Sequence, residues 1–557
     1  MFGYDQQPGW SLSVDISQYQ AAAWWPGRVM DTGLPVVGQA IDTQPVAEPG
    51  MRCRGAQALA FGADWYGRIH LLPALLELGN VIKTSTFPIE VWNSHDDVRT
   101  LQSITATGTT GGLALSSETE TAAPLAFGAL QSRIYTLTVA SSGDPIIDAD
   151  YRYQFEAETL QLQVTGRRIV IWSFRPNWES GITERLQWAT DILTAYDGSE
   201  QRVRLREHAR RWIEYGFLVQ GHDARLLESL TFGWGARLYC LPVWWEADFL
   251  AHPLPAGSTS VTVTDAACKD YRAGGLALFW QDTGTNEAVE ILAITGNTLT
   301  LKLPLSQTFP AGSRVLPAVL ARLEGETRYA HVTDRIVTGQ ARFAVDGNID
   351  RPAAEMGPTW HDYAVLDERP DRSEDVSETW ARTLAVLDHL TGMVTVDDTS
   401  GSPIIRRTYS WLLQGRTAIH RWKQWAAARA GAFQALWLPS FADDLELVQT
   451  VGSGESTIRV RNTLSARYVG AHPLRAAVRI ELSNGTVQHR LVTGIRELDG
   501  TSEAIGIDSS LGFVLQPADV VRIQWMGLAR LDADAVEIYY ESDDIARLTA
   551  TFRMVPS

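Results

Sequence analysis

The feature that most constrains this chain of 557 residues is an internal repeat. Residues from about Arg175 to Val345 are echoed, in the same order, by residues from about Arg369 to Val555. Each copy begins with Arg-Pro, continues through an Arg-Arg pair, an aromatic strand and a helix-like stretch that reaches Leu-Pro, and closes with an alternating strand. A duplication on this scale predicts two similar modules, which can occupy two near-equivalent places in a ring.

The pattern along the chain predicts a mainly β, multidomain fold. Residues 1–67 are rich in Gly, Pro, Gln and aromatic side chains and lack periodicity, so we expect an extended arm or irregular cap. Residues 68–170 hold short alternating segments between turns, without helices, which predicts an immunoglobulin-like β-sandwich. The two copies follow as repeat A, 171–346, and repeat B, 347–557.

Each repeat is expected to be a β module that carries an inserted small β-barrel. The barrels are predicted at 252–323 and 449–531, where short strands are separated by Gly and Asn turns. The last strand of each copy is expected to return to the sheet of its own module.

Helices are expected to flank the sheet of each module. Leu186 and Ile192 are among the apolar residues at helical spacing, so a first helix is predicted at 181–198 and its counterpart at 377–392. A strand, a second helix and a strand that ends in Leu-Pro are expected to follow in both copies.

Composition limits the compartment and the partners. The formal charge of −17 argues against a protein that wraps nucleic acid, although negative charge suits the wall of a channel through which DNA passes. Three cysteines without metal-like spacing predict free thiols in a reducing compartment. The N-terminus lacks a signal-peptide pattern, and no apolar stretch approaches the length of a membrane span. We therefore expect synthesis and folding in a cytoplasm.

Motifs of catalysis are not found in the sequence. There is no GxSxG, HExxH, phosphate-binding loop or dinucleotide fingerprint, and the His-Asp neighbours point to opposite faces of a strand. Glu246 and Asp248 beside Trp244-Trp245 could imitate a sugar cleft, but repeat B has Phe441-Ala442-Asp443-Asp444 near the same place, and nothing supplies a second catalytic carboxylate. We predict a protein that is not an enzyme, with no cofactor and no metal.

Arginine and tryptophan are the residues expected to hold neighbouring subunits together. The chain has 20 tryptophans, and nearly all its basic residues are arginine. Both side chains are enriched where interfaces are anchored. The candidate anchors are Trp178, Arg210, Arg211, Trp244, Trp245, Arg406, Arg407 and Trp437.

Two segments carry a resemblance to known families. The pattern from Leu78–Val81 to Asn93 resembles immunoglobulin-like domains of cilia- and centrosome-associated proteins. The segment Trp172–Phe217, with Phe174, Pro176-Asn177-Trp178, Gly198–Arg202 and Arg210-Arg211, resembles tail proteins of long-tailed bacteriophages and prophages, as does Trp437–Phe441. Repeat B departs from the first of these motifs, because Glu368–Asp371 stands at the matching place.

The second resemblance implies a structural protein of the tail tip, similar to distal tail or baseplate hub proteins with a tube-type β fold. The implied partners are further copies of the chain (a trimer with pseudo-six-fold symmetry, or a hexamer), the tail tube protein, the tape measure protein, the baseplate hub and receptor-binding proteins. It implies a place in the virion tail after assembly in the host bacterial cytoplasm, with no membrane and no specific nucleic-acid binding. The alternative is a carbohydrate-binding adhesin built of immunoglobulin-like and β-barrel modules.

Overall fold

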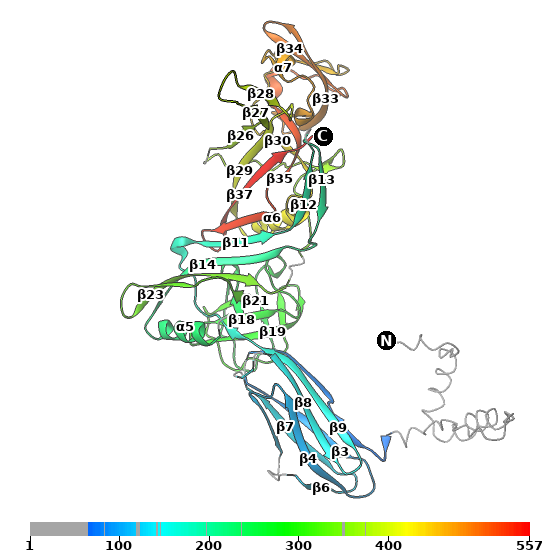
Figure 1. Cartoon of the computed structure of the whole chain (residues 1–557), viewed down its shortest axis with the longest axis vertical. Helices are drawn as coiled ribbons and strands as arrows, with labels where there is room; N and C mark the ends of the chain where they lie inside the picture. The colour runs from blue at the N-terminus through cyan, green and yellow to red at the C-terminus, as the bar shows by residue number, and fades with distance from the viewer. Residues whose placement is uncertain are drawn as a thin grey trace, which may run out of the picture. The chain divides into compact units, whose positions relative to one another are not determined.

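The computed structural model describes residues 65–556, apart from 83, 118–122, 141–142, 145, 196–197, 235–236, 348–350 and 374. The arm predicted at 1–67 lies outside this part, except at its end. The described chain is mainly β, as expected, and it divides between Arg168 and Ile169 into a first unit and a second unit (Figure 1). No helix in the described ranges is long and apolar enough to cross a membrane.

The first unit contains two β-sheets, with strand orders β1-β3-β7-β5 and β2-β9-β8-β4-β6. Neighbouring strands are antiparallel except β2 and β9, which run parallel. The strands are β1 (Ile69–Leu72), β2 (Leu75–Val81), β3 (Ser85–Asn93), β4 (Arg99–Gly108), β5 (Leu113–Ser117), β6 (Leu125–Phe127), β7 (Ser132–Val139), β8 (Ile146–Phe155) and β9 (Thr159–Arg168).

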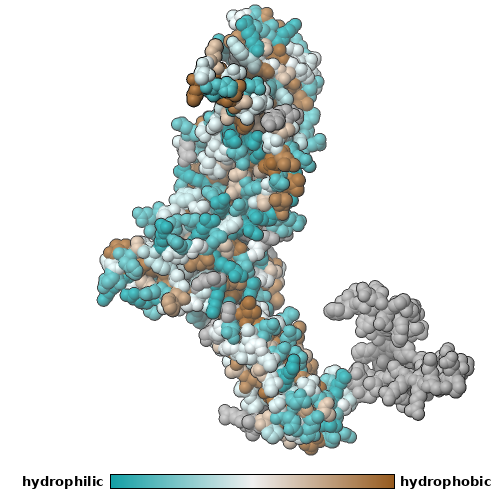
Figure 2. Space-filling view, in the orientation of Figure 1, coloured by the Kyte–Doolittle hydropathy of each residue, from teal (hydrophilic) through white to brown (hydrophobic). Residues whose placement is uncertain are grey.

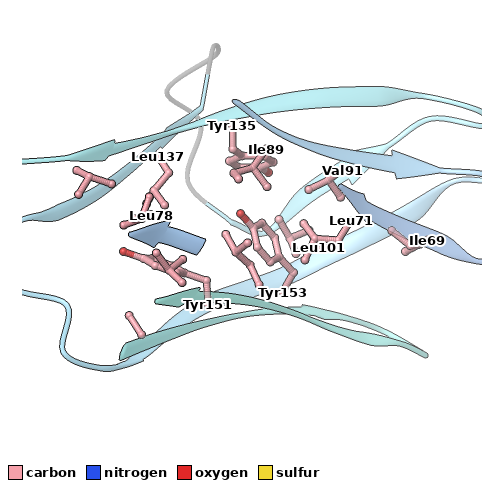
Figure 3. Close-up of a cluster of buried hydrophobic side chains, with 14 of the residues drawn as sticks. Ile69, Leu71, Leu78, Ile89, Val91, Leu101, Tyr135, Leu137, Tyr151 and Tyr153 are labelled. Atoms are coloured by element: carbon pink, nitrogen blue, oxygen red, sulfur yellow. The ribbon is translucent and has the colours of Figure 1, made fainter. Parts of the chain in front are cut away.

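Side chains from both sheets share one core. Every second residue of β8 is buried, as the alternating sequence pattern predicts. Figure 3 shows Ile89 and Tyr135 of one sheet facing Tyr151 and Tyr153 of the other. The rings of Tyr135 and Tyr153 meet edge to face, with centroids 5.5 Å apart.

Asn93, at the end of β3, is a polar residue in this apolar surrounding. Its side chain is fully buried, and its Nδ2 donates to the carbonyl oxygens of Asp97 and Gly128, each at 2.9 Å. Its Oδ1 accepts from the backbone N–H of His95 at 3.1 Å. The amide therefore links the loop after β3 to the loop after β6.

We expect Asn93→Ala to lower the free energy of unfolding of the first unit by about 1–3 kcal/mol, because it leaves buried backbone groups without partners. Thr105→Ala, at an exposed position of β4, is the control and should change it by less than about 0.5 kcal/mol. Hydrogen exchange followed by mass spectrometry reports each unit separately. Equal protection in the two variants would contradict this role for Asn93.

Repeat A forms the first half of the second unit. Its elements are β10 (Val170–Ile171), β11 (Ile182–Gln187), β12 (Thr190–Thr194), β13 (Glu200–Arg204), β14 (Arg210–Gln220), α5 (His222–Gly233), β15 (Leu238–Pro242), β16 (Asp248–Phe249), β17 (Ser260–Thr262), β18 (Leu276–Trp280), β19 (Asn286–Thr295), β20 (Thr298–Leu301), β21 (Arg314–Leu323), β22 (Arg328–His331) and β23 (Ile336–Val345), with 3-10 turns η3 (Trp178–Ser180), η4 (Trp244–Glu246) and η5 (Ala266–Cys268).

Repeat B has a similar order of elements, with one additional short helix. They are β24 (Thr359–Trp360), β25 (Tyr363–Ala364), β26 (Ser377–Ala381), β27 (Leu384–Leu387), β28 (Thr395–Asp398), β29 (Ile404–Gln414), α6 (Arg416–Arg429), β30 (Leu436–Pro439), β31 (Thr457–Arg461), α7 (Ser465–Tyr468), β32 (Ala477–Leu482), β33 (Val487–Asp499), β34 (Ser502–Ile507), β35 (Val520–Leu531), β36 (Ala535–Tyr540) and β37 (Ile545–Met554), with 3-10 turns η6 (Pro473–Arg475) and η7 (Pro517–Asp519).

The two repeats have the same strand register. Gln220 of β14 faces Ile336 of β23, and Gln414 of β29 faces Ile545 of β37 in the same way. Equivalent residues of β14 and β29 are therefore 194 positions apart in the sequence, and equivalent residues of β23 and β37 are 209 positions apart. These two displacements also relate β11 to β26 and β22 to β36. The duplication seen in the sequence is thus a duplication of hydrogen-bonding pattern.

The helices predicted at 181–198 and 377–392 are wrong. The first range forms β11 and β12, and the second forms β26 and β27. In β11, Ile182, Glu184 and Leu186 are all buried on one face, which is strand periodicity. The carboxylate of Glu184 interrupts the apolar alternation in the sequence, so only helical spacing remained visible. The second predicted helices are confirmed as α5 and α6.

The inserted blocks have cores of their own, but no closed barrel is found in the described chain, which corrects the expectation at 252–323 and 449–531. In repeat A the pairings run β17-β20-β19-β18-β21-β16 and stop there. In repeat B they run β31-β34-β33-β32-β35, and only isolated bridges link the two ends. The long strands β21 and β35 extend out of the blocks to pair with β23 and β37, so each block shares a strand with its parent sheet.

Candidate functional site

A single strand joins the two repeats. β11 pairs antiparallel with β14 of its own repeat and, along its other edge, with β36 of repeat B. The sheet therefore runs without a break from β22 through β23, β14, β11, β36 and β37 to β29 and β26 (Figure 1). Backbone hydrogen bonds of this kind fix the position of one repeat against the other to within a residue.

Close approach at this junction requires a glycine. Gly181 precedes β11 with a φ of +64°, and a Cβ there would lie 2.5 Å from the ring of Tyr539 in β36. The hydroxyl of Tyr539 donates to the carbonyl oxygen of Ser180 at 3.0 Å. Glycine is the residue that allows both the backbone conformation and the contact.

Six buried charged side chains lie between the repeats, and we call them the charge cluster: Glu184, Arg211, Glu246, Asp270, Arg351 and Lys423. Repeat A supplies the three carboxylates and Arg211, whereas Arg351 and Lys423 come from repeat B. Three carboxylates face three cationic side chains, so the formal charges of the cluster balance.

The contacts within the charge cluster are short. Arg211 lies 2.6 Å from Glu184 and 2.7 Å from Asp270, measured between guanidinium nitrogens and carboxylate oxygens. The Nζ of Lys423 lies 2.7 Å from Glu184 and 3.5 Å from Glu246. Arg351 lies 2.7 Å from Asp270. Lys423, on α6, therefore reaches across the junction to two glutamates of repeat A.

These contacts set the ionisation of the carboxylates. Burial alone would raise the pKa of Asp270, but Arg211 and Arg351 outweigh it and hold that pKa well below its usual value. The pKa of Glu184 is lowered in the same way, because Arg211 and Lys423 outweigh its burial. The pKa of Glu246 is raised by burial and by the nearby charge of Asp270. The first two are therefore held as anions by partners on both sides of the junction.

Aromatic rings cover the charge cluster. Trp245 is fully buried and stacks on Tyr540 of β36, with ring centroids 4.5 Å apart. The guanidinium of Arg211 and the ammonium of Lys423 lie 5.6 Å and 5.5 Å from the Trp245 ring centre. The hydroxyl of Tyr540 donates to Glu184 at 2.6 Å. Apolar area, cation–π contact and a hydrogen bond thus combine at one place.

The hairpin β12–β13 of repeat A makes a second contact with repeat B. The N–H and hydroxyl of Thr190 both donate to the carboxylate of Asp534, each at 2.7 Å. The side chain of Glu200, 1% exposed, lies 2.6 Å from Arg530 and 3.5 Å from Arg553. The hairpin therefore reaches past the shared sheet to a part of repeat B far away in the sequence.

The predicted anchors have different positions. Arg211, Trp244, Trp245, Arg407 and Trp437 are buried within the chain and offer almost no surface to another chain. Of these, the structure brings Arg211 and Trp245 together at the junction, while Arg407 pairs with Glu378 at 2.9 Å and Trp437 donates to the carbonyl oxygen of Trp360 at 2.8 Å. Arg210 is exposed, and Trp178 and Arg406 are half-buried.

The two Arg-Arg pairs are not structural equivalents. In the shared register, Arg211 corresponds to Ile405, and Arg407 corresponds to Ile213. The pairs are thus displaced by two residues relative to each other. Both arginines still point to the buried face, because a shift of two residues preserves the side of a strand.

The sugar cleft considered at Trp244-Trp245 is not present. Both rings are buried, with 2% and 0% exposed, and a sugar platform needs an open face. Glu246 belongs to the charge cluster, and Asp248 pairs with Lys269 at 2.6 Å. Within the described residues no group of three metal-binding side chains is found.

Sequence reasoning singled out Arg211 and, for a different role, Glu246, but it missed the other four charge-cluster residues and Tyr540. One signal was available. Lys423 is one of four lysines in the chain, and it lies among Trp and Ala residues of a predicted helix. A lone ammonium on such a face indicates a buried ion pair. The sequence does not indicate its partners, which are far away along the chain.

Comparison with protein-family models and with curated proteins gives no match.

Proposed function

We propose that this chain is a structural component of a bacteriophage tail tip or baseplate. It forms a ring around the tail channel and joins the tail tube to the hub and receptor-binding proteins. The observation that carries the proposal is the unbroken sheet across the two repeats. A module that continues edge to edge into an equivalent module builds a closed ring when the rotation between neighbours divides a full turn.

The finer architecture is part of the same proposal. The two-sheet first unit is an immunoglobulin-like sandwich that decorates the ring, and each repeat is a tube-type module. Three chains supply six modules, which match a six-fold tube on one side and a three-fold hub on the other. Six chains would supply twelve modules in one or two stacked rings.

Two features support this assignment over the adhesin. The tryptophans and carboxylates that suggested a sugar cleft are buried in packing between and within the repeats. The net charge of −17 suits a channel through which the tape measure protein and DNA pass without sticking. In this proposal the protein resides in the virion tail after assembly in the bacterial cytoplasm.

End-on electron microscopy of tail particles that contain this chain tests the proposal. A ring of three copies supports the pseudo-six-fold arrangement, and a ring of six supports the enlarged ring. Particles in which a C-terminal label on the chain never lies around the tail axis would overturn the proposal. Particles with the unlabelled chain are the control.

A further inference from the structure

Repeat A contacts repeat B through β11, and repeat B has an equivalent strand, β26, with one open edge among the described strands. β11 has partners on both edges, but its equivalent β26 pairs only with β29 among the described strands. At the opposite end of the sheet, β22 is the equivalent of β36 and, within the described ranges, pairs only with β23. The sheet, as far as it is described, therefore ends in two open strand edges, and the equivalents of these two edges pair with each other at the internal junction.

The side chains on the two open edges resemble those that meet at the internal junction. Glu184 of β11 corresponds to Glu378 of β26, so both copies keep a glutamate at the same place. Tyr540, which donates to Glu184, corresponds to His331 of β22, another side chain that can donate to a carboxylate. His331 and Glu378 are both exposed in the single chain.

The hairpin that follows each edge strand gives a second, independent indication. β27–β28 occupies the place of β12–β13, whose inner face touches repeat B. In β27–β28 the corresponding positions are apolar, yet they are 49–60% exposed: Leu384, Val386, Val394 and Val396. Figure 2 shows apolar residues at the surface over this hairpin. An exposed apolar patch of this kind is typical of a surface that binds another protein.

We propose that β26 and the hairpin β27–β28 of one chain bind repeat A of a second copy, along β22. The contact is head to tail and repeats the junction between repeats A and B. In the shared register, Ser377 faces Ala330 and Thr379 faces Arg328 of the second copy. Contacts of this kind leave one free edge at each end, so they continue until the ring closes. The ring geometry rests on the proposed function, whereas the pairwise contact does not.

Cross-linking between two singly substituted chains tests the register. Ser377→Cys and Ala330→Cys are made separately in a chain with Cys53 and Cys268 replaced by serine, and a short bis-maleimide is added. We expect linked dimers only when the two variants are mixed, because a head-to-tail contact never brings Ser377 beside its own copy. The internal pair Thr183→Cys with Tyr539→Cys is the positive control and should link within one chain.

A matched pair of hairpin variants tests the apolar face. Val386→Asp places a charge on the inner face, and Leu387→Asp places it on the outer face of the same hairpin, at 60% and 57% exposure. We expect Val386→Asp to weaken self-association in sedimentation velocity by about tenfold or more, because it buries an unpaired charge. Leu387→Asp should leave self-association unchanged. Equal effects of the two variants, or no linked dimers in the mixture, would overturn the proposed contact.

These outcomes are separable from those of the ring experiment. Linked dimers together with tails that lack the chain around the axis would leave the contact standing and remove the tail-tip function. A ring in tails together with no cross-link in the mixture would leave the function standing and remove this contact.

Discussion

Arg211→Ala is expected to lower the free energy of unfolding of the second unit by about 3–5 kcal/mol. The guanidinium is fully buried, and it lies within 2.7 Å of both Glu184 and Asp270. Its removal leaves two buried carboxylates, which then face only Lys423 and Arg351. Loss of one partner from a buried ion pair costs more than the pair itself contributes.

The neighbouring arginine provides the control. Arg210 is exposed, so Arg210→Ala should change the free energy of unfolding by less than about 0.5 kcal/mol. Thermal unfolding by calorimetry, with hydrogen exchange to assign each transition, measures both variants. The transition of the second unit should shift in Arg211→Ala alone, and that of the first unit should not move. Equal shifts in the two variants would show that the charge cluster does not hold the repeats together.

The sequence was sufficient to predict the duplication, the mainly β class and the second helix of each repeat. It was misleading where a buried charge stood in a strand. Glu184 lies between Ile182 and Leu186 on the buried face of β11, and a charged residue there breaks the apolar alternation on which strand prediction relies. In repeat B the reason is different: β26 has no buried residue, so its sequence SETWA shows no apolar alternation that would indicate a strand.

The charge cluster could not be predicted, because its members meet only through tertiary structure. Glu184 and Tyr540 are 356 positions apart in the sequence and are joined by a hydrogen bond. A charged side chain is also expected at the solvated surface, and it is buried only where a partner of opposite charge is present. The Arg-Arg pairs were visible, but their apparent equivalence concealed a shift of two residues between the registers.

Divergence of the repeats follows the use of each surface. Where repeat A meets repeat B inside the chain, Glu200 binds Arg530 and Arg553 in an ionic contact. The corresponding hairpin of repeat B has Val394 at that position, left 49% exposed. An apolar contact suits a surface that must form between separate chains, because burial of apolar area drives association without exact charge pairing.

Trp245→Ala is the second substitution with a large expected effect, about 3–5 kcal/mol on the second unit. The ring is fully buried, stacks on Tyr540 and lies beside two cations, so its loss opens a cavity at the junction of the repeats. Trp380→Ala, at a 50% exposed ring of repeat B, is the control and should change stability by less than about 0.5 kcal/mol.

The same pair of variants separates the tail-tip protein from the adhesin. An adhesin that used Trp245 as a sugar platform would lose polysaccharide binding while its unfolding transition stayed in place. We expect the opposite result for Trp245→Ala in calorimetry and in a glycan-binding assay: a lower transition temperature for the second unit and no sugar binding to lose. The buried stack on Tyr540 is the reason for this expectation, because a ring without an accessible face cannot hold a sugar and its removal must disturb packing.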